Sequence, residues 1–209
     1  MPASKGPAQK HKKVVTAVAA AGLVAAAAIL LPFLWLRPAG GEAEERLPAW
    51  IRKDLIPVDG ASRRGEKLEA LNGIVVHYVG NPGTTARQNR SYYANPDSTV
   101  SSHFLIGLEG EVILCVPLDE KSSASNDRNR DTISIEVCHP DESGVFNEAA
   151  EGSLVRLLDW LCRKFDLPAE SIIRHYDVTG KICPKYYVEH PEAWEALLDR
   201  VRAKLEDKA

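Results

Sequence analysis

The sequence of 209 residues lacks the features that mark several classes of protein. Its 13 Pro and 14 Gly are an ordinary share, which excludes collagen-like and low-complexity chains. A net charge of −3 provides no positive surplus for a polyanion, so we expect no nucleic-acid partner. A hydrophobic content of 44% excludes a wholly disordered chain. The length fits one domain of ordinary size with an additional segment.

Acidic residues are absent before Glu42, whereas five basic residues precede it: Lys5, Lys10, Lys12, Lys13 and Arg37. Residues 38–209 carry 29 acidic against 21 basic side chains, a net charge of −8. A basic head followed by an acidic body indicates two different environments.

Charged side chains are also absent from residues 14–36. As a helix this uncharged run would be roughly 34 Å long, enough to cross a bilayer core of about 30 Å. Lysines precede the run and glutamates follow it, so residues 1–13 are predicted to be a basic cytoplasmic tail. The sequence therefore predicts a single-pass protein of the cell membrane, anchored by its N-terminal helix, with everything after Arg37 outside the cytoplasm.

A cleaved signal peptide is the alternative interpretation of the same run. The apolar part of a signal peptide spans 7–15 residues, and this run is longer. Gly41-Glu42-Ala43 is also a poor cleavage site. Both observations favour an anchor that is retained.

The remainder divides into a juxtamembrane linker at 37–65 and a domain at 66–209, long enough for one core. The linker holds Leu47, Trp50, Ile51 and Leu55, which are apolar enough for part of it to pack on the domain.

The domain alternates strand and helix patterns. Apolar runs and period-two alternation predict strands at 74–79, 101–108, 111–116 and 132–138. Within the last strand, Glu136 is predicted on the face opposite Ile133 and Ile135. Helices are predicted at 84–94, 154–165 and 191–205. The expected fold class is α/β, with a mixed central sheet flanked by helices.

Three histidines stand out, because His77 and His103 lie in predicted strands and His175 follows a short apolar segment. A single strand histidine is more often a satisfied core residue than a ligand. However, Cys183 lies eight residues after His175 in a loop with a glycine. Two imidazoles and a thiolate form a three-ligand zinc set that leaves a fourth position for water. Spacing alone does not establish such a site.

Four motifs, taken in order, resemble a known family. They are Val76-His77-Tyr78, Ser102-His103-Phe104, Ile133-Ser134-Ile135-Glu136 and His175-x5-Lys181-x-Cys183-Pro184. Together they resemble the zinc-dependent N-acetylmuramoyl-L-alanine amidases of type 2, which are related in fold to phage T7 lysozyme and peptidoglycan recognition proteins. The resemblance covers about residues 66–205. It implies an enzyme that binds peptidoglycan and hydrolyses the amide between N-acetylmuramic acid and L-alanine.

By position, the resemblance implies that His77, His175 and Cys183 are the ligands of a Zn²⁺ cofactor. It makes Glu136 the catalytic acidic residue and Lys181 a catalytic cation. The alternatives are an ordinary exposed strand glutamate and a solvated loop lysine.

One departure from the phage enzyme concerns Ser102, which stands where that enzyme has a tyrosine. The acid–base role must then fall on Glu136. His103 is a candidate for substrate contact or for packing. Asn81 and Asn126 are predicted to contact substrate, because the loops at 81–85 and 122–129 are expected to line the groove.

Two other classes of protein remain possible. A non-catalytic binding module of this fold would lack the ligand cysteine, whereas Cys183 is present. A glycosidase would need a second carboxylate across the bond, and no motif provides one beside Glu136. The other cysteines, Cys115, Cys138 and Cys162, can form at most one internal disulfide among themselves. The size of the domain favours none.

Overall fold

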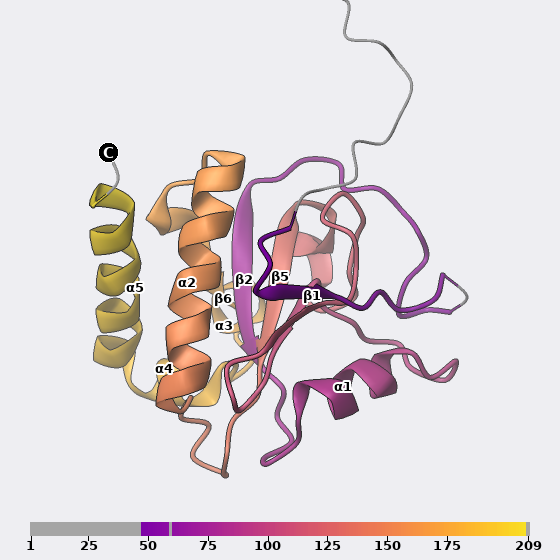
Figure 1. The fold of residues 1–209 in the computed structure, drawn as a ribbon, viewed down its shortest axis with the longest axis horizontal. Helices are drawn as coiled ribbons and strands as arrows, with labels where there is room; N and C mark the ends of the chain where they lie inside the picture. The colour runs from indigo at the N-terminus through magenta and orange to yellow at the C-terminus, as the bar shows by residue number, and fades with distance from the viewer. Residues whose placement is uncertain (1–46, 59, 208–209) are drawn as a thin grey trace, which may run out of the picture. The chain divides into compact units, whose positions relative to one another are not determined.

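The computed structural model describes residues 47–58 and 60–207, which form a mixed sheet with helices on both faces (Figure 1). Within these residues the sheet has six strands in the order β1-β4-β3-β5-β2-β6. Strands β3 and β4 pair antiparallel, and the other neighbours pair parallel. This arrangement confirms the predicted mixed sheet. The strands are β1 (Ile51–Lys53), β2 (Gly73–Tyr78), β3 (Phe104–Ile106), β4 (Val112–Leu114), β5 (Thr132–Val137) and β6 (Ile172–Arg174).

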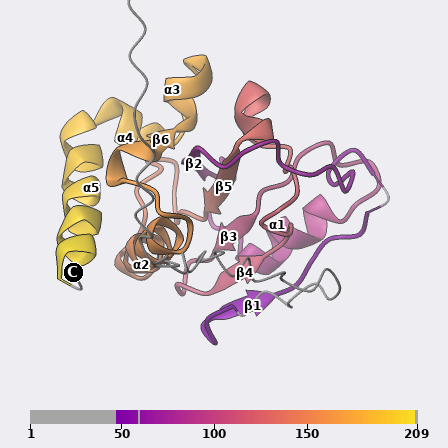
Figure 2. The same ribbon diagram turned by 90° about the horizontal axis from the view of Figure 1, so that it is seen from above.

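The helices divide between the two faces of the sheet. Helices α2 (Glu148–Phe165) and α5 (Pro191–Glu206) pack side by side on one face, and α1 (Ala86–Tyr93) covers the other (Figures 1 and 2). Two short helices, α3 (His175–Thr179) and α4 (Lys185–Glu189), follow β6. The remaining turns are the 3-10 helices η1 (Asn126–Arg130) and η2 (Ala169–Ser171).

Local sequence accounts for where the longer helices begin. The side chain of Thr85 caps α1 and pairs with Gln88 in a capping box. The Asn147 side chain accepts from the Ala150 N–H, so α2 starts several residues before its apolar stripe. Pro191 occupies the first turn of α5, where its missing N–H costs nothing. All three predicted helices are therefore confirmed.

Alternation along β5 divides its side chains between two cores, as predicted. Ile133, Ile135 and Val137 join the large core under α2 and α5. Cys138 joins the smaller core beneath α1. Glu136 and its neighbour on β2, His77, thus lie on the α1 side, at the carboxyl ends of two parallel strands.

The predicted boundary of the domain at residue 66 is too late, because residues 51–53 form strand β1 of the sheet. The expected packing of part of this segment on the domain is confirmed, since Ile51 is in the large core and Leu47, Trp50 and Leu55 pack against it. Ile51 and Ile56 are buried in the two cores. Arg63 forms a two-bond ion pair with the buried Glu120. Backbone bonds to β4 also protect an edge that would otherwise be open to other chains. The folded domain therefore includes residues well before 66.

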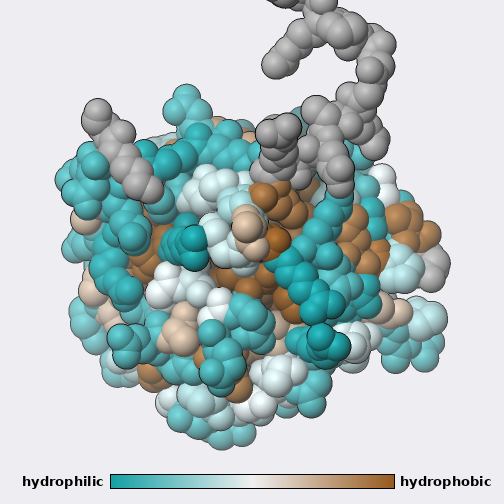
Figure 3. Space-filling view, in the orientation of Figure 1, coloured by the Kyte–Doolittle hydropathy of each residue, from teal (hydrophilic) through white to brown (hydrophobic). Residues whose placement is uncertain are grey.

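No helix within the described residues is long and apolar enough to cross a membrane. The predicted cytoplasmic tail at 1–13 and the membrane segment at 14–36 lie outside those residues. On the face seen in Figure 3, hydrophilic residues cover much of the surface, with hydrophobic residues gathered between them.

Candidate metal centre and active site

Two histidines meet because of the strand register. Val76 of β2 pairs with Arg174 of β6, so the next residues, His77 and His175, emerge side by side at the ends of parallel strands. Their ring centroids are 4.6 Å apart. Both side chains are largely buried, with exposed fractions of 1% and 6%. The sheet itself therefore fixes the spacing of two potential ligands.

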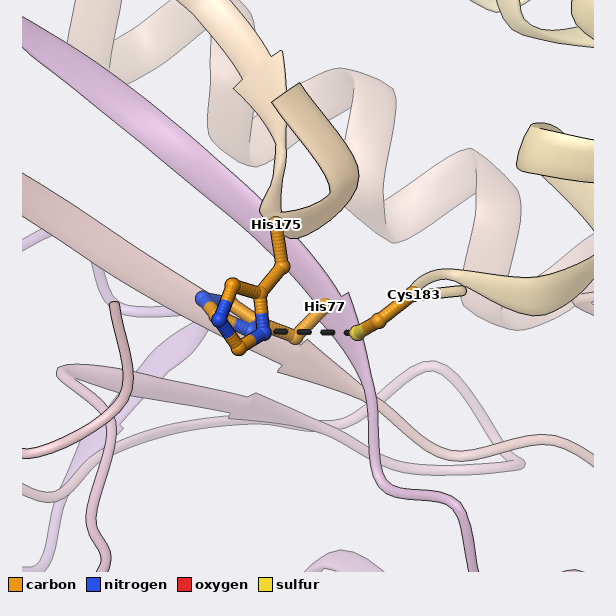
Figure 4. Close-up of side chains that lie close together, drawn as sticks. All are labelled: His77, His175 and Cys183. Carbon is orange, nitrogen blue, oxygen red and sulfur yellow. Dashed lines mark hydrogen bonds between the residues drawn. The ribbon is translucent and has the colours of Figure 1, made fainter. Parts of the chain in front are cut away.

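Cys183 returns to this pair from the loop after α3. Gly180 ends α3 in the left-handed region at φ 77°, which a glycine adopts without strain. The Tyr176 N–H then donates to the Cys183 carbonyl at 2.9 Å and holds the loop against the helix. As a result, Cys183 Sγ lies 3.9 Å from His77 Nδ1 (Figure 4).

The three side chains fit a single metal ion. One donor atom from each of His77, His175 and Cys183 lies within 4.8 Å of the others. Ordinary zinc bond lengths in a tetrahedral site would put a nitrogen and a sulfur ligand about 3.6 Å apart, close to the observed 3.9 Å. Two imidazoles and one thiol are also the donor types that such ions prefer.

Burial shifts the pKa values of the three candidate ligands in a direction that matters for metal binding. It lowers the pKa of both His77 and His175, with a further contribution from Lys181, so both rings are neutral at pH 7 and keep a lone pair. It raises the pKa of the Cys183 thiol to about 12. A bound cation would have to displace that thiol proton.

Glu136 lies directly beside the ligand cluster. It pairs with His77 in the register of β2 and β5, and its Oε1 is 3.9 Å from His77 Nδ1. Its Oε2 is buried and has no hydrogen-bond partner among the described residues. Burial raises the pKa of this carboxyl to about 8, against a smaller lowering by Lys181. The geometry fits a carboxyl that exchanges a proton beside the metal position.

Lys181 is exposed in the same loop as Cys183. Its positive charge lowers the pKa of Glu136, His77 and His175, so it acts electrostatically on all three. The structure therefore brings together the five residues that the resemblance implied.

His103 and Ser102 lie apart from this cluster. Both are fully buried. His103 Nδ1 accepts from the Ser134 N–H at 3.0 Å, and its Nε2 donates to the Glu120 carbonyl at 2.8 Å. Ser102 donates to the Phe104 carbonyl at 2.8 Å. With both ring nitrogens used internally, His103 fits packing and not substrate contact.

The two predicted substrate-binding asparagines have different surroundings. Asn81 is exposed just after β2, and its carbonyl accepts from the Thr84 side chain. Its contact with substrate stays a prediction. Asn126 is also exposed, but its Oδ1 lies 2.9 Å from Nε2 of His175. The adjacent Ser125, which sequence reasoning missed, contacts His77 Nε2 at 3.0 Å.

The other three cysteines, Cys115, Cys138 and Cys162, are buried and carry free thiols, as does Cys183. Burial raises the pKa of Cys138 to about 12 and that of Cys162 to about 11, which makes both poor nucleophiles.

The fold and the cluster together describe an α/β domain with a candidate metal site and an adjacent carboxyl at its strand ends. Comparison with known proteins identifies its family. Residues 67–186 match the family described as N-acetylmuramoyl-L-alanine amidase. The chain belongs to this type 2 amidase family.

Individual relatives agree with this assignment. The chain is 30% identical over 175 residues to the N-acetylmuramoyl-L-alanine amidase BlyA of Bacillus subtilis, covering 74% of this chain and 47% of BlyA. It is 28% identical to the amidase CwlL of Bacillus licheniformis, covering 76% and 48% of the two chains. The chain thus spans about half the length of these curated relatives. The solved catalytic domain of XlyA is 27% identical, with a TM-score of 0.63 over 72% of this chain and 98% of that domain.

Proposed function

We propose that this protein is a zinc-dependent N-acetylmuramoyl-L-alanine amidase that cuts the amide between N-acetylmuramic acid and L-alanine in bacterial peptidoglycan. The observation that carries the proposal is the ligand cluster with Glu136 beside it, 3.9 Å from His77. The names of BlyA and CwlL, both N-acetylmuramoyl-L-alanine amidases, support it.

In this proposal His77, His175 and Cys183 hold the zinc. A zinc ion supplies Lewis acidity, which polarises a carbonyl and acidifies water. Glu136 accepts the proton of the attacking water and later delivers it to the departing amine of L-alanine. Its location beside the cluster, largely shielded from solvent, suits this task. Lys181 stabilises the negative charge that develops on the carbonyl oxygen.

The experiment is digestion of purified peptidoglycan with the full-length chain, followed by separate assays of new amino groups and new reducing ends. We expect free amines of L-alanine and no new reducing ends. Glu136→Gln serves as the matched inactive control, because it keeps the size of the side chain. New reducing ends would instead indicate a glycosidase, and binding without cleavage would indicate a binding module.

We also propose that residues 14–36 anchor the enzyme in the cell membrane, with residues 1–13 in the cytoplasm and the catalytic domain outside. The uncharged run and its lysine-rich and glutamate-rich flanks support this topology. Blotting of membrane and medium fractions tests it. Intact protein in the membrane fraction agrees with the proposal, and a mature chain beginning near residue 44 in the medium would refute it.

A further inference from the structure

The turn before β5 contacts Nε2 of both histidines of the proposed zinc site. Ser125 Oγ lies 3.0 Å from Nε2 of His77. Asn126 Oδ1 lies 2.9 Å from Nε2 of His175. Two consecutive residues thus hold the two imidazoles in the same way, although they lie 48 or more residues away along the chain.

The contact at His175 indicates which nitrogen of that ring carries the proton. An amide oxygen only accepts, so the His175 Nε2 must carry the proton and Nδ1 keeps the lone pair. On His77, Nδ1 is 3.9 Å from both Cys183 Sγ and Glu136 Oε1, so this nitrogen is the one that faces the ligand cluster. Nδ1 is thus the nitrogen with the lone pair on His175 and the nitrogen that faces the cluster on His77.

The turn that carries Ser125 and Asn126 is itself held rigidly by the protein. Asn129 Oδ1 accepts from the N–H groups of Ala124 and Ser125, at 3.0 and 2.6 Å. Ser125 is fully buried. Asn126 has φ of 54°, a left-handed conformation that asparagine tolerates better than most residues. These contacts involve neither a metal ion nor a substrate, so they hold the turn in place independently of both.

We propose that Ser125 and Asn126 are positioning residues that fix the tautomer and orientation of His77 and His175, so that both offer Nδ1 to the metal. This inference rests on the proposed zinc site. It gives Asn126 the role of holding a metal ligand in place of the substrate contact expected from sequence. Partners of this kind commonly contribute 10–100-fold to metal affinity.

The test compares zinc affinity among variants of the full-length chain, by competition with a chromophoric chelator. Asn126→Gly removes the acceptor but still permits a positive φ. It therefore tests the loss of the side chain without forcing a change in backbone conformation. We expect its zinc affinity to fall about 10-fold or more. Asn126→Asp retains an acceptor oxygen at the same position and should restore affinity to at least the original value. Ser125→Ala should weaken binding by a similar factor.

Asp127→Ala is the matched control, because Asp127 is exposed in the same turn and is not one of the two residues that contact the histidines. Its zinc affinity should stay within about twofold, well inside the change expected for a lost histidine partner. Thermal unfolding of each metal-free variant checks that the fold persists. Unchanged affinity in Asn126→Gly, or a loss that Asn126→Asp fails to restore, would overturn the inference. Because the readout is zinc affinity, a chain that binds zinc in this pattern but lacks amidase activity would refute the proposed function alone.

Discussion

His77 and Glu136 occupy paired positions on the parallel strands β2 and β5, with His77 Nδ1 3.9 Å from Glu136 Oε1. Residues paired in this way point to the same face of a sheet. The carboxyl proposed to transfer the proton and one of the proposed metal ligands are therefore held together by two central strands and not by loops. Rigid elements of this kind position reacting groups more accurately than loops do.

Replacing Glu136 by glutamine should stop catalysis without releasing the metal. The amide keeps the size of the side chain but cannot accept the proton of water. We expect kcat to fall on the order of 100-fold or more, with zinc content unchanged. Steady-state kinetics and metal analysis on the same preparation provide the measurement.

Ser102→Ala is the control for that experiment, because Ser102 is buried and bonds only within the protein. It should leave kcat unchanged and lower stability by about 1 kcal/mol. If Ser102→Ala abolished activity while Glu136→Gln kept most of it, the catalytic role would belong elsewhere.

The same glutamate should make the metal-free protein less stable as pH rises. Its pKa is raised from 4.5 to about 8 in the folded state, so between these values the folded protein binds a proton that the unfolded chain has lost. Stability from this group is present at low pH and is lost as pH rises towards 8. Glu136→Gln should therefore stabilise the metal-free protein at pH 8 by up to about 4 kcal/mol relative to its effect at pH 4.5.

Urea unfolding in the presence of a chelator, at both pH values, measures this difference. An equal effect of the substitution at the two pH values would show that the folded protein does not hold the Glu136 carboxyl in its protonated form.

Lys181→Ala should separate catalysis from metal binding. The lysine is exposed and contributes charge without being a ligand, so its removal should lower kcat by up to about 10²–10³-fold. Its charge opposes a nearby cation, so zinc affinity should stay the same or rise. A parallel loss of zinc affinity in chelator competition would instead mean that Lys181 supports the loop that carries Cys183.

A domain that begins at residue 66 should be far less stable than one that begins at 47. The shorter chain loses β1, the buried Ile51 and Ile56, and the Arg63 partner of Glu120. Deleting a large buried side chain costs about 2–5 kcal/mol, and breaking a buried ion pair about 3–5 kcal/mol. Thermal unfolding of the two chains compares them, and equal midpoints would show that the segment is a linker after all.

Side-chain patterns were enough to predict the central strands and the long helices, because alternation and helical spacing report which face is buried. Strand β1 was not predicted, because it has only three residues, of which one is buried, and because its pairing with β4 is made by backbone groups. No side-chain pattern signals such an edge strand.

In the site, too, some features could not be predicted from the sequence. His77 and His103 look alike in sequence, since both lie in or beside apolar strands. They differ in their neighbours, because Ser134 and Glu120 occupy both nitrogens of His103. Ser125 was missed for a related reason, as its contact with His77 joins residues 48 positions apart and leaves no local pattern.

If this chain cleaves peptidoglycan amides with one zinc ion held by His77, His175 and Cys183, its activity must depend on that ion. The most direct measurement removes metal from the purified full-length chain, adds zinc stepwise, and follows release of free amines from peptidoglycan. We expect no activity without metal and a plateau at one zinc per chain, with Cys183→Ser strongly impaired in zinc binding because a thiolate ligand is gone. Full activity of the metal-free chain, or undiminished zinc affinity in Cys183→Ser, would contradict this expectation.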